Sequence, residues 1–357
     1  MSGGVDSSVA ALLLERDGIE CVGVTMRLYE NEEIGIAREK TCCSLSDVED
    51  ARWVAGRLGI PYYVMNFADS FEEFVLKPFV EAYEKGHTPN PCIACNRYLK
   101  FDELLQKALM LGCDHIATGH YAKVVWDEAS GRFLLKKAAD PAKDQTYMLY
   151  TLSQEMLSHV KLPLGDLTKE AVRAMADEAG LVNSRKRDSQ DICFVQSGTY
   201  ADFIERYTGK KYPEGEFVDM TGKVLGTHKG VIRYTIGQRK GLGLALPQSM
   251  YVVRLDLANN RVVLGFEEDL YASEMIVRDL NLIDCDSIEE PRRAIVKTRY
   301  SHKGAPALVR QTDENEVHVR FDEPQRAITA GQAAVFYDGD TVIGGGTITE
   351  ALGSGKA

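Results

Sequence analysis

The sequence predicts an α/β fold: a doubly wound parallel-sheet domain followed by two small β-rich, barrel-like domains. Helix and strand patterns alternate through the first half, which is typical of βα units around a parallel sheet. A turn rich in glycine and serine opens the first helix, a feature of phosphate-binding α/β domains. From about residue 199, short strands separated by turn residues replace the alternation. We expect domains at 1–198, 199–271 and 272–357.

The first half supplies the helices and strands of the predicted parallel sheet. Helix patterns cover 6–16, 46–59, 70–86 and 100–112. Strand patterns cover 21–29 and 60–67, and the stretch 113–125 contains a strand that ends in a Thr-Gly-His turn at 118–120. Ser46 is expected to cap the second helix, because Glu49 follows it three residues later as in a capping box. Pro78 is expected to kink the third helix. Ligands of such sheets bind at the carboxyl ends of the strands.

The second half begins with one helix pattern at 199–209 and continues as hairpins. Turn residues at 221–222, 259–260, 313–315 and 338–340 separate runs of alternating hydrophobicity. This arrangement is typical of antiparallel strand pairs. We therefore expect one or two small barrels here.

Composition and charge narrow the class of protein. Of the 357 residues, 45% are hydrophobic and 27% are charged, as in a globular protein of two or three domains. The sequence has neither a signal-peptide pattern nor an apolar run of about 18 residues, so we expect a cytoplasmic protein that does not engage a membrane. The net charge of −11 argues against a general nucleic-acid coating protein, but local basic clusters such as 185–187 are compatible with an RNA-binding enzyme.

The opening turn has the composition of an anion-binding loop. It comprises Met1, Ser2, Gly3, Gly4, Val5, Asp6, Ser7 and Ser8. Glycines let the backbone approach an anion, the hydroxyls of Ser2, Ser7 and Ser8 can donate hydrogen bonds, and the following helix N-terminus favours phosphate. The alternative is an ordinary glycine turn with a capping serine. No Gly-Lys-Ser/Thr follows, so this is not the lysine-containing P-loop.

Such a turn normally follows a β-strand, yet no strand pattern precedes it in this sequence. We therefore expect the true start to lie upstream in the gene. The preceding segment would form a strand of about 5–8 residues.

Three cysteines lie in polar surroundings. Eight cysteines in a cytoplasmic chain are not expected to form a disulfide framework. Cys92 and Cys95 form a Cys-x-x-Cys just before the helix pattern at 100–112, where a helix N-terminus lowers a thiol pKa. Cys193 lies between aspartates and a following helix. Structural cysteines are the alternative for all three, and zinc would need further ligands.

The opening turn resembles the PP-loop of the ATP pyrophosphatases, which adenylate a substrate and release pyrophosphate. Taken together, eight ordered motifs resemble the tRNA-specific 2-thiouridylases of the MnmA/TrmU family over nearly the whole chain. These motifs are SGGVDSS, TPNPCIACNRYLKF, ATGHYA, KDQTYMLY, DSQDICF, YTIGQRKGLG, VKTRYSH and AGQAAVFY. The resemblance implies a PP-loop domain with the adenine nucleotide α-hydrolase-like fold and two β-rich domains.

The implied activity is that of a tRNA-uridine 2-sulfurtransferase. It would use ATP and Mg²⁺ to exchange the C2 oxygen of the wobble uridine in Lys, Glu and Gln tRNAs for sulfur. A sulfur-relay protein or a cysteine desulfurase would supply a persulfide.

The resemblance also assigns roles to residues. The opening turn would hold ATP phosphates, and Met26 and Gly119 would contact adenosine. Cys95 resembles the nucleophile, and Cys193 resembles the persulfide carrier, with thiol–disulfide exchange between the two. The residues that resemble tRNA contacts are Asn90, Pro91, Cys92, His120, Lys143, Asp144, Gln145, Arg299, Tyr300 and Gln332.

Cys92 departs from the family pattern, in which many members have an aspartate thought to act as acid or base. Cys92 is then either a thiol at the base-binding loop or, with Cys95 and Cys193, a ligand of a [4Fe–4S] cluster. The pair Cys42–Cys43 is unexplained. Two other functions stay open at this point: a PP-loop ligase acting on a small molecule, and a non-catalytic RNA-binding metal protein.

Overall fold

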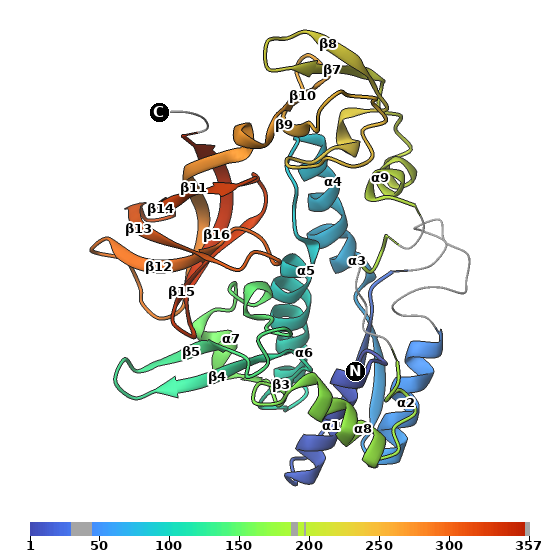
Figure 1. Ribbon diagram of the computed structural model, residues 1–357. Coiled ribbons are helices and arrows are strands. Elements are labelled where there is room, and N and C mark those ends of the chain that lie inside the picture. Colours follow the sequence, from blue (N-terminus) through green and yellow to red (C-terminus); the bar gives the residue numbers. More distant parts are fainter. Residues whose placement is uncertain (30–44, 187–191, 196–197, 354–357) are drawn as a thin grey trace. The chain divides into compact units, whose positions relative to one another are not determined.

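The computed structural model describes residues 1–29, 45–186, 192–195 and 198–353 (Figure 1). The chain divides into two compact units. The first consists of Met1–Leu76, Pro91–Gly198 and Asp340–Val342, and the second of Lys77–Asn90, Thr199–Gly339 and Ile343–Ala357. The second unit combines the two regions that we expected as separate β-rich domains.

The first unit has the βα architecture that the sequence predicts. Strand β1 (Gly23–Arg27) pairs in parallel with β2 (Tyr62–Asn66), and β3 (Ile116–Ala117) pairs in parallel with β6 (Val160–Lys161). Helix α2 (Leu45–Leu58) connects β1 to β2, while α1 (Val5–Arg16) packs on α8 (Lys169–Glu178). A buried core joins α1 and α8 through Val5, Val9, Val54, Tyr121, Leu164, Val172, Ala176 and Leu181. The predicted α/β class with parallel strands is confirmed.

Helix α2 starts one residue earlier than the capping pattern indicates. Because the helix begins at Leu45, Ser46 lies within its first turn rather than at the cap. The prediction that Ser46 is the N-cap is therefore wrong. A serine near a helix start marks the boundary only to within one or two residues.

The helix expected at 70–86 is broken by a π-helical stretch. It consists of α3 (Ala68–Phe71), η1 (Glu72–Leu76) and α4 (Lys77–Glu84). Pro78 has no N–H for the helical ladder, and the wider π turn lies just before it. We expected Pro78 to kink this helix, and the irregularity that the structure shows there is the π-helical stretch before Pro78.

The helix expected at 100–112 begins much earlier, at Pro91. It consists of α5 (Pro91–Ala94), η2 (Cys95–Glu103), which is π-helical, and α6 (Leu104–Met110). Proline is favoured at the first helical position, where no N–H partner is needed. Cys92 and Cys95 therefore lie inside a helix, and the expectation that they lie just before one is wrong.

An antiparallel hairpin in the first unit was not predicted. The strand expected to end at the Thr-Gly-His turn of 118–120 is β3; after that turn comes β4 (Ala122–Asp127), which pairs with β5 (Arg132–Lys137). Asp127 accepts hydrogen bonds from the N–H and hydroxyl of Ser130, and Gly131 has a φ of +63°. This Asp-x-x-Ser-Gly turn was the available signal. Short helical segments follow at η3 (Thr146–Met148) and α7 (Gln154–Ser158).

The second unit contains α9 (Tyr200–Thr208), a small sheet and a closed barrel. The sheet order is β8 (Val224–His228), β7 (Gly215–Asp219), β10 (Arg261–Gly265) and β9 (Tyr251–Asp256). The barrel order is β11 (Tyr271–Leu282), β14 (Glu316–Arg326), β13 (Ala305–Asp313), β12 (Arg292–Lys297), β15 (Ala333–Asp338) and β16 (Thr341–Leu352), and β11 closes it by pairing with β16. All four predicted hairpin turns are confirmed by strands on both sides.

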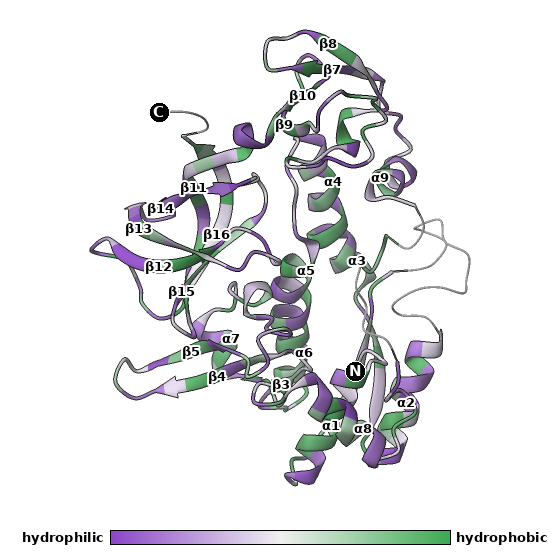
Figure 2. Cartoon of the chain, viewed as in Figure 1, coloured by the Kyte–Doolittle hydropathy of each residue, from purple (hydrophilic) through white to green (hydrophobic). Residues whose placement is uncertain are grey.

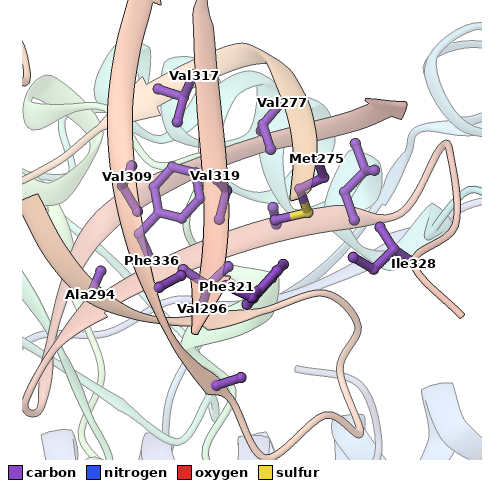
Figure 3. Packing of buried hydrophobic residues seen from close by; sticks show 14 of the residues in the cluster. Met275, Val277, Ala294, Val296, Val309, Val317, Val319, Phe321, Ile328 and Phe336 are labelled. Carbon is purple, nitrogen blue, oxygen red and sulfur yellow. The ribbon is translucent and has the colours of Figure 1, made fainter. Parts of the chain in front are cut away.

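Alternation of hydrophobic and polar residues builds the barrel core. Along β12 and β13 buried positions alternate with more exposed ones, and Figure 2 shows hydrophilic and hydrophobic stretches along β12. Figure 3 shows the inward side chains, among them Met275, Val296, Val309, Val319 and Phe336. Strand β11 was not predicted, because a register shift between Ala272 and Glu274 breaks its alternation. No helix in the described residues is long and apolar enough to cross a membrane.

We predict that Asp202→Asn weakens the start of α9. Thr199 and Asp202 form a capping box, and Arg233 donates to the Asp202 carboxylate over 2.8 Å. These bonds from Thr199 and Arg233 lower the pKa of Asp202 to about 2. The substitution should lower the free energy of unfolding at pH 7 by about 1 kcal/mol.

The pH dependence gives the second readout of this prediction. A lowered carboxylate pKa stabilises the fold above the unfolded pKa, and that stability is lost as pH falls through the folded pKa. The difference between wild type and Asp202→Asn in denaturant unfolding should therefore shrink between about pH 4 and pH 2. Asp166→Asn, which removes an exposed partner of Lys123, is the control and should change stability by less than about 0.5 kcal/mol. A pH-independent difference for Asp202→Asn would contradict the prediction.

Candidate active site

The opening turn forms a compact loop at the N-terminus of α1. Gly4 caps this 12-residue helix with extended backbone, at φ −88° and ψ 159°. The Ser7 hydroxyl donates to the Gly4 carbonyl over 3.0 Å and accepts from the Ser2 N–H over 3.1 Å. Ser2 is exposed, while Gly4 and Ser7 are partly exposed. Backbone N–H groups at a helix start, with two accessible hydroxyls, are suited to bind phosphate oxygens.

Ser8 serves the loop itself. Its hydroxyl is fully buried, donates to the Gly4 carbonyl over 3.0 Å and accepts from the Asn183 amide over 2.9 Å. The same Asn183 amide also donates to the Gly3 carbonyl over 3.0 Å. The expectation that the Ser8 hydroxyl donates to phosphate is therefore not met, because that hydroxyl is already used and faces the interior.

Two glycines allow close approach of the backbone around the loop. Gly3 has a φ of +72°, and a Cβ added there would lie 2.4 Å from the Asp47 carbonyl oxygen. A Cβ added at Gly119 would lie 2.6 Å from the Asp6 carbonyl carbon and 2.7 Å from the Ser7 nitrogen. The structure thus brings Gly119, a predicted adenosine contact, directly against the loop.

Strand β1 lies against the other end of the loop. The Met1 amino group donates to the Val24 carbonyl, and the Thr25 hydroxyl donates to the Met1 carbonyl over 2.5 Å. Met26, the second predicted adenosine contact, follows Thr25 and is partly exposed. The loop, Met26 and Gly119 therefore form one neighbourhood in the first unit.

The carboxylate of Asp6 is held by two side chains that the motifs did not reveal. The Lys169 ammonium lies 2.7 and 2.8 Å from the two Asp6 carboxylate oxygens, and the Tyr121 hydroxyl donates over 2.7 Å. Lys169 is only 8% exposed. A lysine in the first turn of α8 opposes the helix dipole, and this unfavourable position was the available sequence signal.

The segment that contains Lys143, Asp144 and Gln145 braces Tyr121. Gln145 and Tyr121 exchange two hydrogen bonds of 2.9 Å, one through the Gln145 side-chain oxygen. Asp144 accepts from the Ala138 N–H over 3.1 Å and from the Thr146 hydroxyl over 2.7 Å. The Asp144 carboxylate and the Gln145 side-chain oxygen thus stabilise the fold of this segment. The predicted role of these residues as tRNA contacts did not include this structural role. Lys143 is partly exposed.

His120 is held as a neutral side chain. Burial, followed by the charge of Lys100, lowers its pKa well below the usual value for histidine. Its Nδ1 lies 2.8 Å from the Thr118 hydroxyl, and its ring packs beside Phe101. Any contact that His120 makes with RNA near neutral pH is therefore a hydrogen bond or a stacking contact of a neutral ring.

The predicted reactive cysteines are anchored by buried neighbours. Cys92 is exposed and Cys95 is half-buried, and both are thiols in the helix that starts at Pro91. Asn96, which is 2% exposed, donates to the Met148 carbonyl over 3.1 Å and fixes the turn that contains Cys95. The predicted thiolate chemistry requires that the Cys92 and Cys95 thiols keep their positions and that Cys92 stays accessible.

Cys193 is also a half-buried thiol. Its carbonyl accepts a hydrogen bond of 3.0 Å from Tyr29. The next residue, Phe194, is 1% exposed and packs edge-on against Phe71 at 5.8 Å between ring centroids. The backbone on the C-terminal side of Cys193 is therefore held in place.

The described residues do not support the [4Fe–4S] site that was one of the two alternatives for Cys92. Cys92, Cys95 and Cys193 are all described, yet no group of three His, Cys, Asp or Glu side chains among the described residues is placed to hold a metal ion. A cubane with three protein ligands needs three converging thiolates. Cys42 and Cys43 lie outside the described residues.

Of the remaining predicted tRNA contacts, Pro91 is the first residue of α5 and belongs to the first unit. The others belong to the second unit: Asn90, Arg299, Tyr300 and Gln332. The Gln332 amide donates to the Thr88 carbonyl over 2.6 Å, so it fixes the segment that leads to Asn90. Arg299 is partly buried, and its buried Nε has no hydrogen-bond partner among the described residues. Tyr300 is 41% exposed, and an exposed ring of this kind can stack on an RNA base.

Comparisons with known proteins cover nearly the whole chain. Three family models match it: the tRNA methyl transferase HUP domain at residues 1–197, the tRNA methyl transferase PRC-barrel domain at 201–266 and the aminomethyltransferase beta-barrel domain at 272–348. Two of the relatives below are named "tRNA-specific 2-thiouridylase MnmA", and the third is named "tRNA-specific 2-thiouridylase MnmA 1". That of Clostridioides difficile is 51% identical over 99% of this chain and 97% of its own length. That of Acetivibrio thermocellus is 54% identical over 98% and 97%, and one from Thermoanaerobacter sp. is 51% identical over 98% and 96%.

Proposed function

The chain belongs to the family of tRNA-specific 2-thiouridylases, and from this premise we propose that it is a tRNA-uridine 2-sulfurtransferase. It replaces the C2 oxygen of the wobble uridine in Lys, Glu and Gln tRNAs by sulfur and consumes ATP. The observation that carries the proposal is the loop of Ser2–Ser8, which opens α1 and lies against Gly119. A small-molecule ligase and a non-catalytic RNA-binding protein are not favoured by relatives that match 98% or more of the chain.

The loop has the properties that an ATP triphosphate requires. The exposed Ser2 hydroxyl lies beside the backbone N–H groups of a helix N-terminus, and Gly3 and Gly119 leave no side chain in the way. Mg²⁺ would bind chiefly through phosphate oxygens, and Asp6 is the acidic side chain of the loop. The ion would neutralise phosphate charge during adenylation.

Adenylation turns a poor leaving group into a good one. The C2 oxygen of uridine attacks the α-phosphorus of ATP, pyrophosphate leaves, and C2 then carries an AMP ester. Sulfur attacks C2, and AMP departs with the original oxygen. The uridine must leave its base stack to be reached, and Asn90, Pro91 and Cys92 are the proposed contacts for it.

Cys193 and Cys95 supply the sulfur. A donor protein transfers a sulfane sulfur to Cys193, which becomes a persulfide. The Cys95 thiolate attacks the Cys193 sulfur, which releases sulfide and leaves a Cys95–Cys193 disulfide. An external thiol reductant then restores both thiols for the next turnover. The alternative is direct attack of the persulfide on C2, with Cys95 resolving the resulting covalent intermediate to the same disulfide.

The experiment that tests this function is mass analysis of tRNA nucleosides. The full-length protein is incubated with ATP, Mg²⁺, a persulfide donor and unmodified Lys, Glu and Gln tRNA transcripts. We expect 2-thiouridine at the wobble position together with AMP and pyrophosphate. Transcripts with cytidine at that position are the matched control and should gain no sulfur. Methylated nucleosides, or pyrophosphate release that is independent of tRNA with no sulfur incorporated, would contradict the proposal.

A further inference from the structure

Lys186 joins three parts of the first unit beside the opening loop. Its ammonium donates to the Gly3 carbonyl over 3.2 Å, to Asp47 over 2.5 Å and to Asp50 over 2.6 Å. Gly3 belongs to the loop, whereas Asp47 and Asp50 lie in the first turns of α2. None of the sequence motifs assigned a role to this lysine.

The backbone around Lys186 is itself fixed. Arg173 of α8 donates to the Ser184 carbonyl over 3.0 Å and to the Lys186 carbonyl over 3.2 Å. The Lys186 side chain is one-third exposed, and those of Asp47 and Asp50 are 14% and 27% exposed. Hydrogen bonds therefore hold both the backbone and the ammonium group of Lys186 in place. Because these side chains are partly buried, water screens their charges only in part.

The two carboxylates lie close to the loop that is proposed to bind ATP. The Asp47 backbone is so near Gly3 that no Cβ fits between them. Negative charge at this position would repel a triphosphate unless a cation compensates it. Burial lowers the pKa of Lys186, but hydrogen bonds and charge from Asp47 and Asp50 outweigh this and raise it, so the side chain stays charged.

We propose that Lys186 is a positioning residue that makes the loop competent for ATP. It cancels the charge of Asp47 and Asp50 beside Gly3, so that the triphosphate meets the loop donors without repulsion. This inference rests on the proposed function, because it assumes that the loop binds ATP.

The test measures Mg·ATP binding by calorimetry with the full-length protein and four variants. Lys186→Met should weaken ATP binding about tenfold or more, because it leaves two uncompensated carboxylates beside the loop. Lys186→Arg should retain most of the affinity. The triple variant Lys186→Met/Asp47→Asn/Asp50→Asn should bind within about threefold of wild type, because the repulsion is gone. Lys123→Met, which removes a comparable lysine from the exposed Asp166, is the control and should bind like wild type.

Three outcomes would overturn the inference. The first is wild-type affinity in Lys186→Met. The second is a triple variant as weak as Lys186→Met, because that result would point to loop shape or direct phosphate contact rather than charge cancellation. If Lys186→Met does not fold, Asp47→Asn/Asp50→Asn alone decides: we expect ATP binding as tight as wild type or tighter, and a tenfold loss is the third contradicting outcome. Wild-type protein that binds no ATP would instead refute the proposed function.

Discussion

Cys193→Ser is expected to abolish 2-thiouridine formation, with a loss of about 1,000-fold or more, while ATP binding and thermal stability stay close to wild type. Serine has nearly the shape of cysteine but cannot carry a sulfane sulfur. The bond from Tyr29 to the Cys193 carbonyl and the packing of Phe194 on Phe71 involve no atom of the thiol. The change should therefore remove the chemistry and keep the local fold.

Three measurements separate this result from general damage. Nucleoside mass analysis reports thiolation, calorimetry reports Mg·ATP affinity, and thermal unfolding reports stability. Cys113→Ser is the matched control, because Cys113 is also a partly exposed cysteine of the first unit, in a segment with no predicted role. Residual thiolation in Cys193→Ser above about 1% of wild type with a persulfide donor would show that another cysteine carries the sulfur.

Gly119→Ala is the second substitution with a large expected effect. Its methyl group would lie 2.6–2.8 Å from backbone atoms of Asp6 and Ser7, so either the loop or the segment at Gly119 must move. Overpacking of this kind costs about 1–3 kcal/mol. A displacement of the loop misplaces the α-phosphorus, and the kcat/KM for ATP should fall about 100-fold.

A glycine in open space provides the control. Gly56 lies on the exposed side of α2, and a Cβ added there would meet no atom within 4 Å. Gly56→Ala should leave activity unchanged and raise stability by up to about 1 kcal/mol, because alanine is the better helix former. Wild-type kinetics in Gly119→Ala, with wild-type thermal stability, would contradict the close packing on which the prediction depends.

Local patterns predicted the parts of the fold that depend on neighbouring residues. The hairpins around 221–222, 259–260, 313–315 and 338–340 were found because turn residues and alternation are local signals. Strand β11 was missed because its bulge interrupts the alternation, and Ser46 was misplaced because a cap and a first-turn serine look alike. The early start of the helix at Pro91 was missed because a proline is compatible with a loop as well as with a first helical position.

The sequence by itself determined the chemistry available to this protein. Gly3, Gly4, Ser2 and Ser7 specify a phosphate-binding loop through their own backbone freedom and hydroxyl groups, whatever surrounds them. Cys95 and Cys193 likewise supply thiols by identity alone. These properties reside in single residues and short spacings, so no tertiary contact is needed to recognise them.

Only the tertiary structure decided which distant groups surround that loop. Asn183, Lys186, Lys169 and Tyr121 lie more than 100 residues from Ser2–Ser8, yet their side chains bond to Gly3, Asp6 and Ser8. Neither periodicity nor propensity distinguishes Lys186 from the other members of a set of 42 lysines and arginines, and the position of Lys169 at a helix start does not identify its partner. Folding brings these lysines to their partners, because the packing of α2 and α8 places them within reach. A buried carboxylate or backbone carbonyl is stable only with a hydrogen-bond partner.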